Sequence, residues 1–200
     1  MAASFRFGGL TTAGPREATE QFARTAETVG LDTILMADHL IEIADAPTSL
    51  MFMADQTDRI RIGTYVMCAD FRHPVVMARG LANIDELSGG RLEVGLRAGY
   101  LRREYEAAGI PLASGTVRLA RLQETTAIVK AMLTTSPVEF TGNHFALSGQ
   151  VAFPVARQRP RPPFLIGGGG PKLLSWAAAE ADIVSFVPQS AVDATCGCRP

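Results

Sequence analysis

The sequence lacks the features that mark membrane, secreted and nucleic-acid-binding proteins. None of its apolar runs approaches the ~18 residues needed to cross a bilayer, and the amino terminus has no long apolar core of the kind found in signal peptides. Its 19 basic and 20 acidic residues nearly cancel, which argues against binding to nucleic acid or to a membrane surface through bulk charge. We therefore expect a cytoplasmic protein.

Cysteine is also scarce, and the three residues present give no disulfide framework. Cys68 lies just past an apolar run, whereas Cys196 and Cys198 fall near the end of the chain. The last two could suggest a metal site, but two thiols without a nearby histidine are weak evidence. The three histidines are not spaced as metal ligands either. We predict no metal.

What the sequence does contain is a regular alternation of apolar runs and amphipathic stretches. With 47% hydrophobic residues, the chain can bury a sizeable core. Apolar, β-branched runs predict buried strands at about 4–8, 32–37, 60–67, 91–96, 163–167 and 182–187. Helical patterns fall between Pro15 and Gly30 and at about 47–58, 74–87, 115–134 and 171–181. This alternation predicts an α/β fold with a parallel sheet.

The first predicted helix has clear start and end signals. Pro15 suits the first helical position and Gly30 suits the residue that closes a helix. An apolar face is expected between them, made by Ala18, Phe22, Ala26 and Val29.

Two long segments interrupt the rhythm between the fourth and fifth strands. Residues 97–114 and 135–162 carry loop signals, and the alternation around Gly142-Asn143 predicts a small β-hairpin. Insertions of this kind are often lids or substrate loops, although a surface ornament is an equally acceptable interpretation.

The strand count leaves two architectures open. A closed (β/α)₈ barrel has eight strands in ~250 residues, whereas six are predicted here. The fold is either a doubly wound sheet or a shortened barrel. We assign residues 1–187 to this one domain and residues 188–200, which show no helical period, to a carboxyl-terminal tail.

Candidate reactive residues follow the apolar runs, where parallel α/β folds place their ligands. His39, beside Asp38, could transfer protons near neutral pH, or it could be a structural histidine. His73 precedes Pro74 and is expected to brace the start of a helix, and His144 is expected to be exposed on the hairpin.

A glycine run after the fifth strand offers a possible phosphate site. Gly167, Gly168, Gly169 and Gly170 precede a helix, and Lys172 lies alongside. Bare amides at a helix amino terminus suit a phosphate, although tight turns need glycine too.

Arg102, Arg103 and Glu104 lie just past the fourth strand. They could contact the anionic part of a ligand. An exposed helical turn is the simpler interpretation.

Taken together, these segments resemble the bacterial luciferase-like monooxygenase superfamily, and within it the oxidoreductases that use the deazaflavin coenzyme F420. The motifs that carry the resemblance are Ala37-Asp38-His39, Phe71-Arg72-His73-Pro74, Asp85-Glu86-Leu87-Ser88-Gly89-Gly90-Arg91, Ala98-Gly99-Tyr100-Leu101-Arg102-Arg103-Glu104-Tyr105 and Ile166-Gly167-Gly168-Gly169-Gly170-Pro171. Their order and spacing span residues 5–187. The resemblance implies a TIM (β/α)₈-type barrel, here truncated to about six βα units, with an insertion between strands 4 and 5.

The resemblance also implies roles for individual residues. His39 would be the catalytic proton-transfer residue, with Asp38 beside the deazaflavin ring. The turn near Cys68 and Ala69 would back the ring, in a bulge that often holds a non-proline cis peptide. The remaining cofactor-binding residues would be Ala98, Gly99, Tyr100, Arg103, Gly167, Gly168, Gly169, Gly170 and Lys172.

Two positions depart from the family pattern. Arg97 replaces a residue that is usually small, and Tyr100 replaces the glutamate of the sugar-phosphate dehydrogenases. The leading hypothesis is an F420-dependent oxidoreductase acting on a small organic substrate, and a homodimer would cover the open edges of its shortened barrel. An FMN-dependent monooxygenase of the same superfamily is one alternative. A catalytically inactive flavin-binding protein or a non-functional fragment is another.

Overall fold

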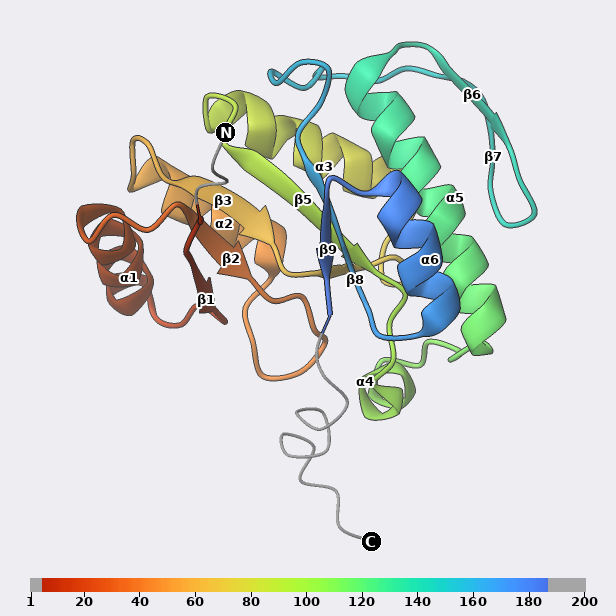
Figure 1. The fold of residues 1–200 in the computed structure, drawn as a ribbon, viewed down its shortest axis with the longest axis horizontal. Coiled ribbons are helices and arrows are strands. Elements are labelled where there is room, and N and C mark those ends of the chain that lie inside the picture. The colour runs from red at the N-terminus through yellow and green to blue at the C-terminus, as the bar shows by residue number, and fades with distance from the viewer. Residues whose placement is uncertain (1–4, 187–200) are drawn as a thin grey trace, which may run out of the picture.

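The computed structural model of the chain describes residues 5–186, which form a parallel sheet with helices packed along it (Figure 1). The predicted tail and the strand limits before residue 5 or beyond residue 186 lie outside these residues. The strands are β1 (Gly8–Thr11), β2 (Thr33–Met36), β3 (Arg61–Thr64), β4 (Met67–Cys68), β5 (Leu92–Arg97), β6 (Val138–Thr141), β7 (Ala146–Gln150), β8 (Phe164–Gly167) and β9 (Ile183–Ser185). The helices are α1 (Arg16–Thr28), α2 (Ala46–Asp55), α3 (Pro74–Leu87), α4 (Arg102–Ala107), α5 (Gly115–Thr134) and α6 (Pro171–Glu180).

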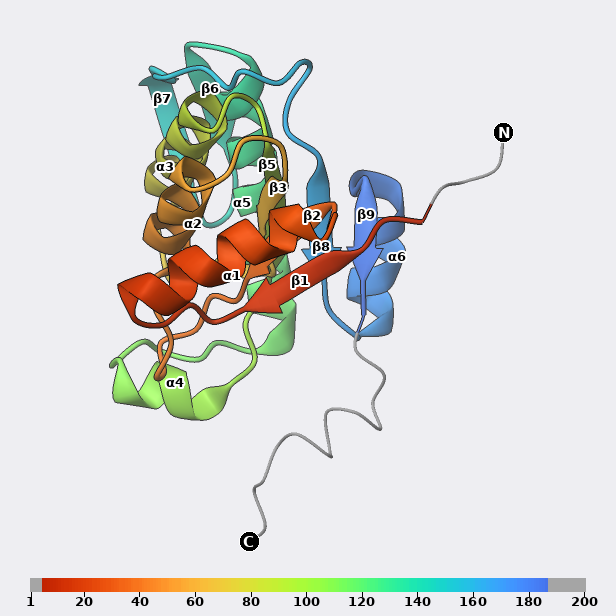
Figure 2. The same ribbon diagram turned by 90° about the vertical axis from the view of Figure 1, so that its left-hand side faces the viewer.

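The order of the strands decides between the two predicted architectures. The main sheet runs β1-β2-β3-β5-β8-β9, with β4 also paired to β5. Every pairing in it is parallel. This order follows the chain without the reversal that defines a doubly wound sheet. The sheet curls and the helices lie along it in chain order, as in part of a barrel (Figures 1 and 2). The described residues therefore form a partial (β/α)₈-type barrel.

Two strand predictions were wrong in detail. The first strand, predicted at 4–8, is β1 at Gly8–Thr11, and Phe5 and Phe7 are exposed. The reason is backbone pairing: Gly8 lies opposite Thr33, where an added Cβ would come within 2.9 Å of the threonine methyl. The third run, predicted at 60–67, divides into β3 and β4 because the chain turns at a cis peptide between Tyr65 and Val66.

The helices lie close to their predicted ranges, but one buried face differs. α3 and α5 have the predicted bounds, and Gly30 closes α1 with a positive φ of 80°. The predicted apolar face of α1 was wrong at Ala18 and Val29, which are exposed. The helix is rotated so that Thr19, Ala23 and Ala26 are buried instead.

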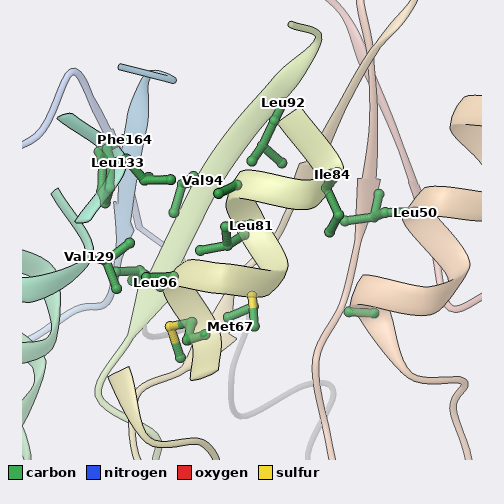
Figure 3. Packing of buried hydrophobic residues seen from close by; sticks show 14 of the residues in the cluster. Leu50, Met67, Leu81, Ile84, Leu92, Val94, Leu96, Val129, Leu133 and Phe164 are labelled. Carbon is green, nitrogen blue, oxygen red and sulfur yellow. The ribbon is translucent and has the colours of Figure 1, made fainter. Parts of the chain in front are cut away.

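The core lies between β5 and the helices α3 and α5 (Figure 3). Leu92, Val94 and Leu96 of β5 are fully buried. They pack with Leu81 and Ile84 of α3, Val129 and Leu133 of α5, and Phe164 of β8. Burying each aliphatic side chain of this size stabilises a fold by about 1.5–3 kcal/mol. This packing fixes β5, and with it the residues that follow its carboxyl end.

The predicted hairpin is present and is tied to the barrel by one carboxylate. β6 and β7 pair antiparallel around the turn at Gly142-Asn143. Glu124 of α5 accepts hydrogen bonds from the backbone N–H groups of Asn143 (2.8 Å), His144 (3.0 Å) and Phe145 (3.0 Å). Desolvation acts to raise the pKa of Glu124, but these donors outweigh it and the net pKa is lowered. His144 itself is half-buried.

The segment 97–114 contains an element that the sequence did not predict as buried. α4 begins at Arg102, and its Glu104 and Tyr105 are buried rather than exposed. The exposed-turn interpretation was therefore wrong for Glu104, although it holds for Arg102 and Arg103.

None of the helices within residues 5–186 is long and apolar enough to cross a membrane.

Replacing Gly95 with alanine should destabilise the fold strongly. An added Cβ would overlap the carbonyl oxygen of Thr64 and lie 2.9 Å from a Val66 methyl. We expect a loss of about 1–3 kcal/mol or more in the free energy of unfolding, measured by urea denaturation. Gly80→Ala is the matched control. Its Cβ meets nothing within 4 Å, so we expect a gain of about 0.5–1 kcal/mol. Equal urea midpoints for the two variants would contradict this account.

Acid should release the hairpin through Glu124. Its folded pKa lies below the ordinary value of 4.5, so its contribution to stability is present above about pH 4.5 and is lost as pH falls through the folded pKa. We expect Glu124→Gln to be less stable than the native chain near neutral pH, with the difference shrinking in acid. Urea midpoints across this range measure it. Glu106→Gln, at an exposed position on α4, is the control. A difference that does not change with pH would refute the prediction.

Candidate functional site

A cleft of about 930 Å³ opens at the carboxyl ends of the strands. Its lining comes from four parts of the chain: the turn after β3, the end of β5 and the residues that follow, the first turn of α5, and the segment from β8 into α6. The lining also includes Ser185 at the end of β9. Figure 1 shows that β5, β8 and β9 end on the same side of the molecule. Ligand clefts of α/β folds lie at this end of the sheet, and their typical volume is about 300–1,000 Å³.

One wall of the cleft is the glycine turn that leads into α6. Gly167, Gly168, Gly169 and Gly170 all line it, followed by Pro171 at the start of the helix. A Cβ added at Gly169 or Gly170 would meet nothing within 4 Å, so the backbone there is open to the cleft. Lys172 also lines the cleft, within the first turn of α6. Open backbone at a helix amino terminus, with an ammonium group nearby, is an arrangement that suits an anion.

Among residues 5–186, the charged side chains that line the cleft are all cationic. They are Arg97, Arg118 and Lys172, and no described aspartate or glutamate lines it. Within the described part of the chain, Nη1 of Arg97 and Nε of Arg118 are buried and have no hydrogen-bond acceptor. Leaving a buried N–H without an acceptor costs about 1–3 kcal/mol. The cleft is therefore suited to a ligand that carries negative charge and hydrogen-bond acceptors.

His39 adjoins this cleft and is held by a buried ionic cluster. Its Nδ1 lies 3.0 Å from Oε2 of Glu104 and 3.2 Å from Nη2 of Arg97. The Glu104 side chain is fully buried, and its Oε2 also accepts a hydrogen bond of 3.0 Å from the backbone N–H of Leu40. The His39 side chain keeps 20% of its exposure and meets the Tyr100 ring edge-on, at 6.1 Å between ring centroids. His39 is thus next to two residues of the cleft lining, Arg97 and Tyr100.

Asp38 is buried, but its carboxylate is directed away from His39. Oδ2 accepts hydrogen bonds from the backbone N–H of Cys68 (3.0 Å) and from Nη1 of Arg72 (2.9 Å). Its backbone carbonyl accepts a hydrogen bond from Nη2 of Arg97 at 2.6 Å. Asp38 therefore joins the ends of β2 and β4, and in this structure it orients no part of the His39 ring.

The residues that face the cleft after β3 are Tyr65 and Val66, not Cys68 and Ala69. The cis peptide joins Tyr65 to Val66, earlier in the chain than the resemblance implied. Cys68 and Ala69 are buried behind the cleft. The Cys68 thiol lies 3.3 Å from the Tyr105 hydroxyl, and burial raises the pKa of both groups. The Cys68 thiol and the Tyr105 hydroxyl are therefore uncharged near neutral pH, and both side chains are packed in the interior.

The structure brings together part of the predicted site. Ala98, Gly99, Tyr100, Gly167, Gly168, Gly169, Gly170 and Lys172 line one cleft. Asp38, His39, Cys68 and Ala69 lie outside its lining, and Arg103 is exposed on α4. The proposed functions of all these residues stay predictions. No group of three or more His, Cys, Asp or Glu side chains within residues 5–186 is placed to hold a metal ion.

Sequence reasoning missed several cleft residues. Arg118 and Leu119 were read only as parts of a helix, and Tyr65 and Ser185 only as parts of strands. The Tyr65 hydroxyl and the Ser185 Oγ lie 2.6 Å apart and join the ends of β3 and β9. The position of Tyr65 and Ser185 at strand ends was the available signal. Nothing in the sequence marked the first turn of α5 as part of the site.

Comparisons with known proteins agree with this geometry. The family model for luciferase-like monooxygenases matches residues 1–195. A protein from Amycolatopsis mediterranei (strain U-32), named F420-dependent glucose-6-phosphate dehydrogenase, is 32% identical over an aligned length of 177 residues, and the match covers 84% of this chain and 52% of that protein. A protein of the same name from Gordonia bronchialis is 32% identical over 195 residues, covering 91% of this chain and 56% of the relative. The chain thus spans about half the length of these curated relatives.

Solved structures resemble the chain over a similar extent. The coenzyme F420-dependent tetrahydromethanopterin reductase from Methanopyrus kandleri superposes with a TM-score of 0.81 at 23% identity, covering 92% of this chain and 55% of that one. The monooxygenase RslO1 from Streptomyces bottropensis has a TM-score of 0.78 at 27% identity, covering 87% and 57%. The strand order, the cleft at the carboxyl ends and the family match lead to one conclusion: the chain belongs to the luciferase-like monooxygenase family.

Proposed function

We propose that this chain binds coenzyme F420 and acts as an F420-dependent oxidoreductase on a small organic substrate. Its curated relatives are named as F420-dependent dehydrogenases, and an F420-dependent reductase and an F420-dependent secondary alcohol dehydrogenase share its fold. When bound, the deazaflavin supplies hydride transfer. The residues described below would hold it and move the proton that accompanies the hydride.

The observation that carries the proposal is the charge of the cleft. F420 is an elongated anion with a phosphate, and the cleft presents Arg97, Arg118 and Lys172, with no carboxylate among its described lining residues. The open backbone at Gly169 and Gly170 leads into α6, whose amino terminus favours a phosphate. The buried N–H groups of Arg97 and Arg118 that have no acceptor within residues 5–186 would gain one from the ligand. The residues present therefore fit an anionic cofactor.

His39 is the candidate for the proton. A substrate that exchanges a hydride at an alcohol or carbonyl carbon must also lose or gain a proton on its oxygen. An imidazole titrates in the range where both directions are accessible near neutral pH. Tyr100 lines the cleft next to His39, and the family resemblance implies that it stands where the sugar-phosphate dehydrogenases have a glutamate. We therefore propose an alcohol or carbonyl substrate without assigning it to the sugar phosphates.

The binding of F420 by the full 200-residue chain tests the proposal. We expect saturable quenching of F420 fluorescence, together with a cooperative thermal unfolding transition that the cofactor moves to higher temperature. Lys172→Ala should weaken F420 binding about tenfold, which corresponds to ~1.4 kcal/mol for one charge-assisted contact. Arg102→Ala is the control, since it removes the same charge at an exposed position on α4 outside the cleft.

A parallel titration with FMN addresses the main alternative. Tighter binding of FMN than of F420 would overturn the deazaflavin proposal in favour of an FMN-dependent monooxygenase. One structural neighbour is named as a monooxygenase. A cooperative melt without binding of either cofactor would identify a folded chain that does not bind flavins. Equal weakening by Lys172→Ala and Arg102→Ala would contradict the proposed role of the glycine turn.

A further inference from the structure

Two groups of opposite hydrogen-bonding character approach the same nitrogen of His39. Oε2 of Glu104, which can only accept when ionised, lies 3.0 Å from Nδ1. Nη2 of Arg97, which can only donate, lies 3.2 Å from the same atom. Nδ1 can satisfy only one of them at a time. The group that prevails determines which ring nitrogen carries the proton.

The other contacts of the cluster decide this competition. Oε2 of Glu104 already accepts the backbone N–H of Leu40, and Oε1 lies 3.4 Å from Nη2 of Arg97. Both contacts favour an ionised carboxylate. If Nδ1 carried no proton, its lone pair would face the Oε2 lone pairs at 3.0 Å. With a proton on Nδ1, that contact becomes a hydrogen bond to Oε2.

Arg97 does not need Nδ1 as an acceptor. Its Nη2 donates to the backbone carbonyl of Asp38 at 2.6 Å, and its Nε donates to the carbonyl of Val66 at 3.1 Å. The second N–H of Nη2 donates to Oε1 of Glu104, at a distance of 3.4 Å. The contacts that Glu104 and Arg97 make around Nδ1 of His39 are then all matched as donor to acceptor.

We propose that Glu104 is a positioning residue that holds the proton of neutral His39 on Nδ1 and leaves Nε2 free to exchange a proton with a ligand. This inference rests on the proposed function and deepens it. In the oxidation of an alcohol, Nε2 takes the hydroxyl proton while the hydride leaves the carbon. In the reduction of a carbonyl, the same atom returns the proton to the oxygen. The buried carboxylate orients the ring and stabilises the imidazolium, as it does in a catalytic triad.

Arg97 is the cationic partner of Glu104 in this arrangement. Glu104 is fully buried, and an ionised carboxylate buried without a cationic partner would strongly destabilise the folded chain. Arg97 supplies that partner from the end of β5. Its guanidinium also lies 5.5 Å from the Tyr100 ring centroid, at the edge of the cleft. Arg97 therefore links the cleft to the carboxylate that sets the state of His39.

Imidazole nitrogen NMR of the full chain, labelled with ¹⁵N and free of cofactor, tests the proposal. The pH is raised until the spectrum of His39 no longer changes, so that the neutral ring is observed, and His39→Gln identifies the signals of His39. We expect Nδ1 of His39 to be protonated. His73 is an internal reference of the opposite tautomer, because its Nδ1 accepts the Val75 N–H at the start of α3. An unprotonated Nδ1 on His39 would overturn the proposal, whether or not any variant folds.

Glu104→Gln separates positioning from simple packing. Without the carboxylate, the N–H of Arg97 is free to donate to Nδ1, and we expect the main tautomer of His39 to change to protonation at Nε2. Glu106→Gln on the same helix should leave the His39 spectrum unchanged, because its carboxylate is exposed and pairs only with Arg102 among the described residues. A folded Glu104→Gln chain with the native His39 pattern would refute the role of Glu104.

The measurement also separates this inference from the proposed function. The tautomer is read without cofactor, so failure of F420 to bind would leave the result for Glu104 and His39 intact. Conversely, F420 binding with an unprotonated Nδ1 would support the cofactor and overturn the positioning role.

Discussion

The described structure depends on β5 being buried along its whole length. All six residues of this strand are buried, and it pairs with β3, β4 and β8. The pairing with β3 includes reciprocal hydrogen bonds between the Thr64 side chain and the backbone of Gly95, at 2.7 and 2.8 Å. This close approach is compatible only with glycine at position 95. A strand held this firmly gives Arg97, at its carboxyl end, a fixed position beneath the cleft.

Cations and carboxylates meet at this end of the sheet, and Arg97 belongs to both groups of contacts, because it lines the cleft and pairs with Glu104. The cleft itself is lined by cations, which suits an anionic ligand. The carboxylates lie one layer deeper, where Glu104 is paired with Arg97 and His39, and Asp38 with Arg72. Burying these carboxylates is acceptable only because each has a cationic partner and backbone N–H donors. The arrangement leaves His39 between the two layers, in contact with the buried charge and next to the ligand space.

Much of the fold could be predicted from the sequence because local patterns determine it. The helices α3 and α5 begin and end where their apolar period and their capping residues indicate, and the glycine turn follows a strand as its composition suggests. The first strand was misplaced because Phe5 and Phe7 look like core residues, although backbone pairing with β2 selects Gly8–Thr11.

The chemistry of the site could be predicted only in part. His39 and Glu104 are 65 residues apart, and no local pattern distinguishes a buried glutamate on α4 from its exposed neighbours. Arg97 was noticed as an unusual residue, but its three roles as donor to Asp38, Val66 and Glu104 depend on contacts between four separate segments. The direction of the Asp38 carboxylate likewise depends on Arg72 and Cys68, which only the folded chain brings near. Position at a strand end is visible in a sequence, whereas the partner of a side chain is not.

A crystal structure of the full chain with F420 would test the central claim most directly. The account predicts that the cofactor phosphate lies near Lys172, at the turn formed by Gly167, Gly168, Gly169 and Gly170. It also predicts that Nδ1 of His39 keeps its hydrogen bond to Glu104. A phosphate bound elsewhere, or a His39 ring turned so that Nδ1 no longer faces Glu104, would contradict it.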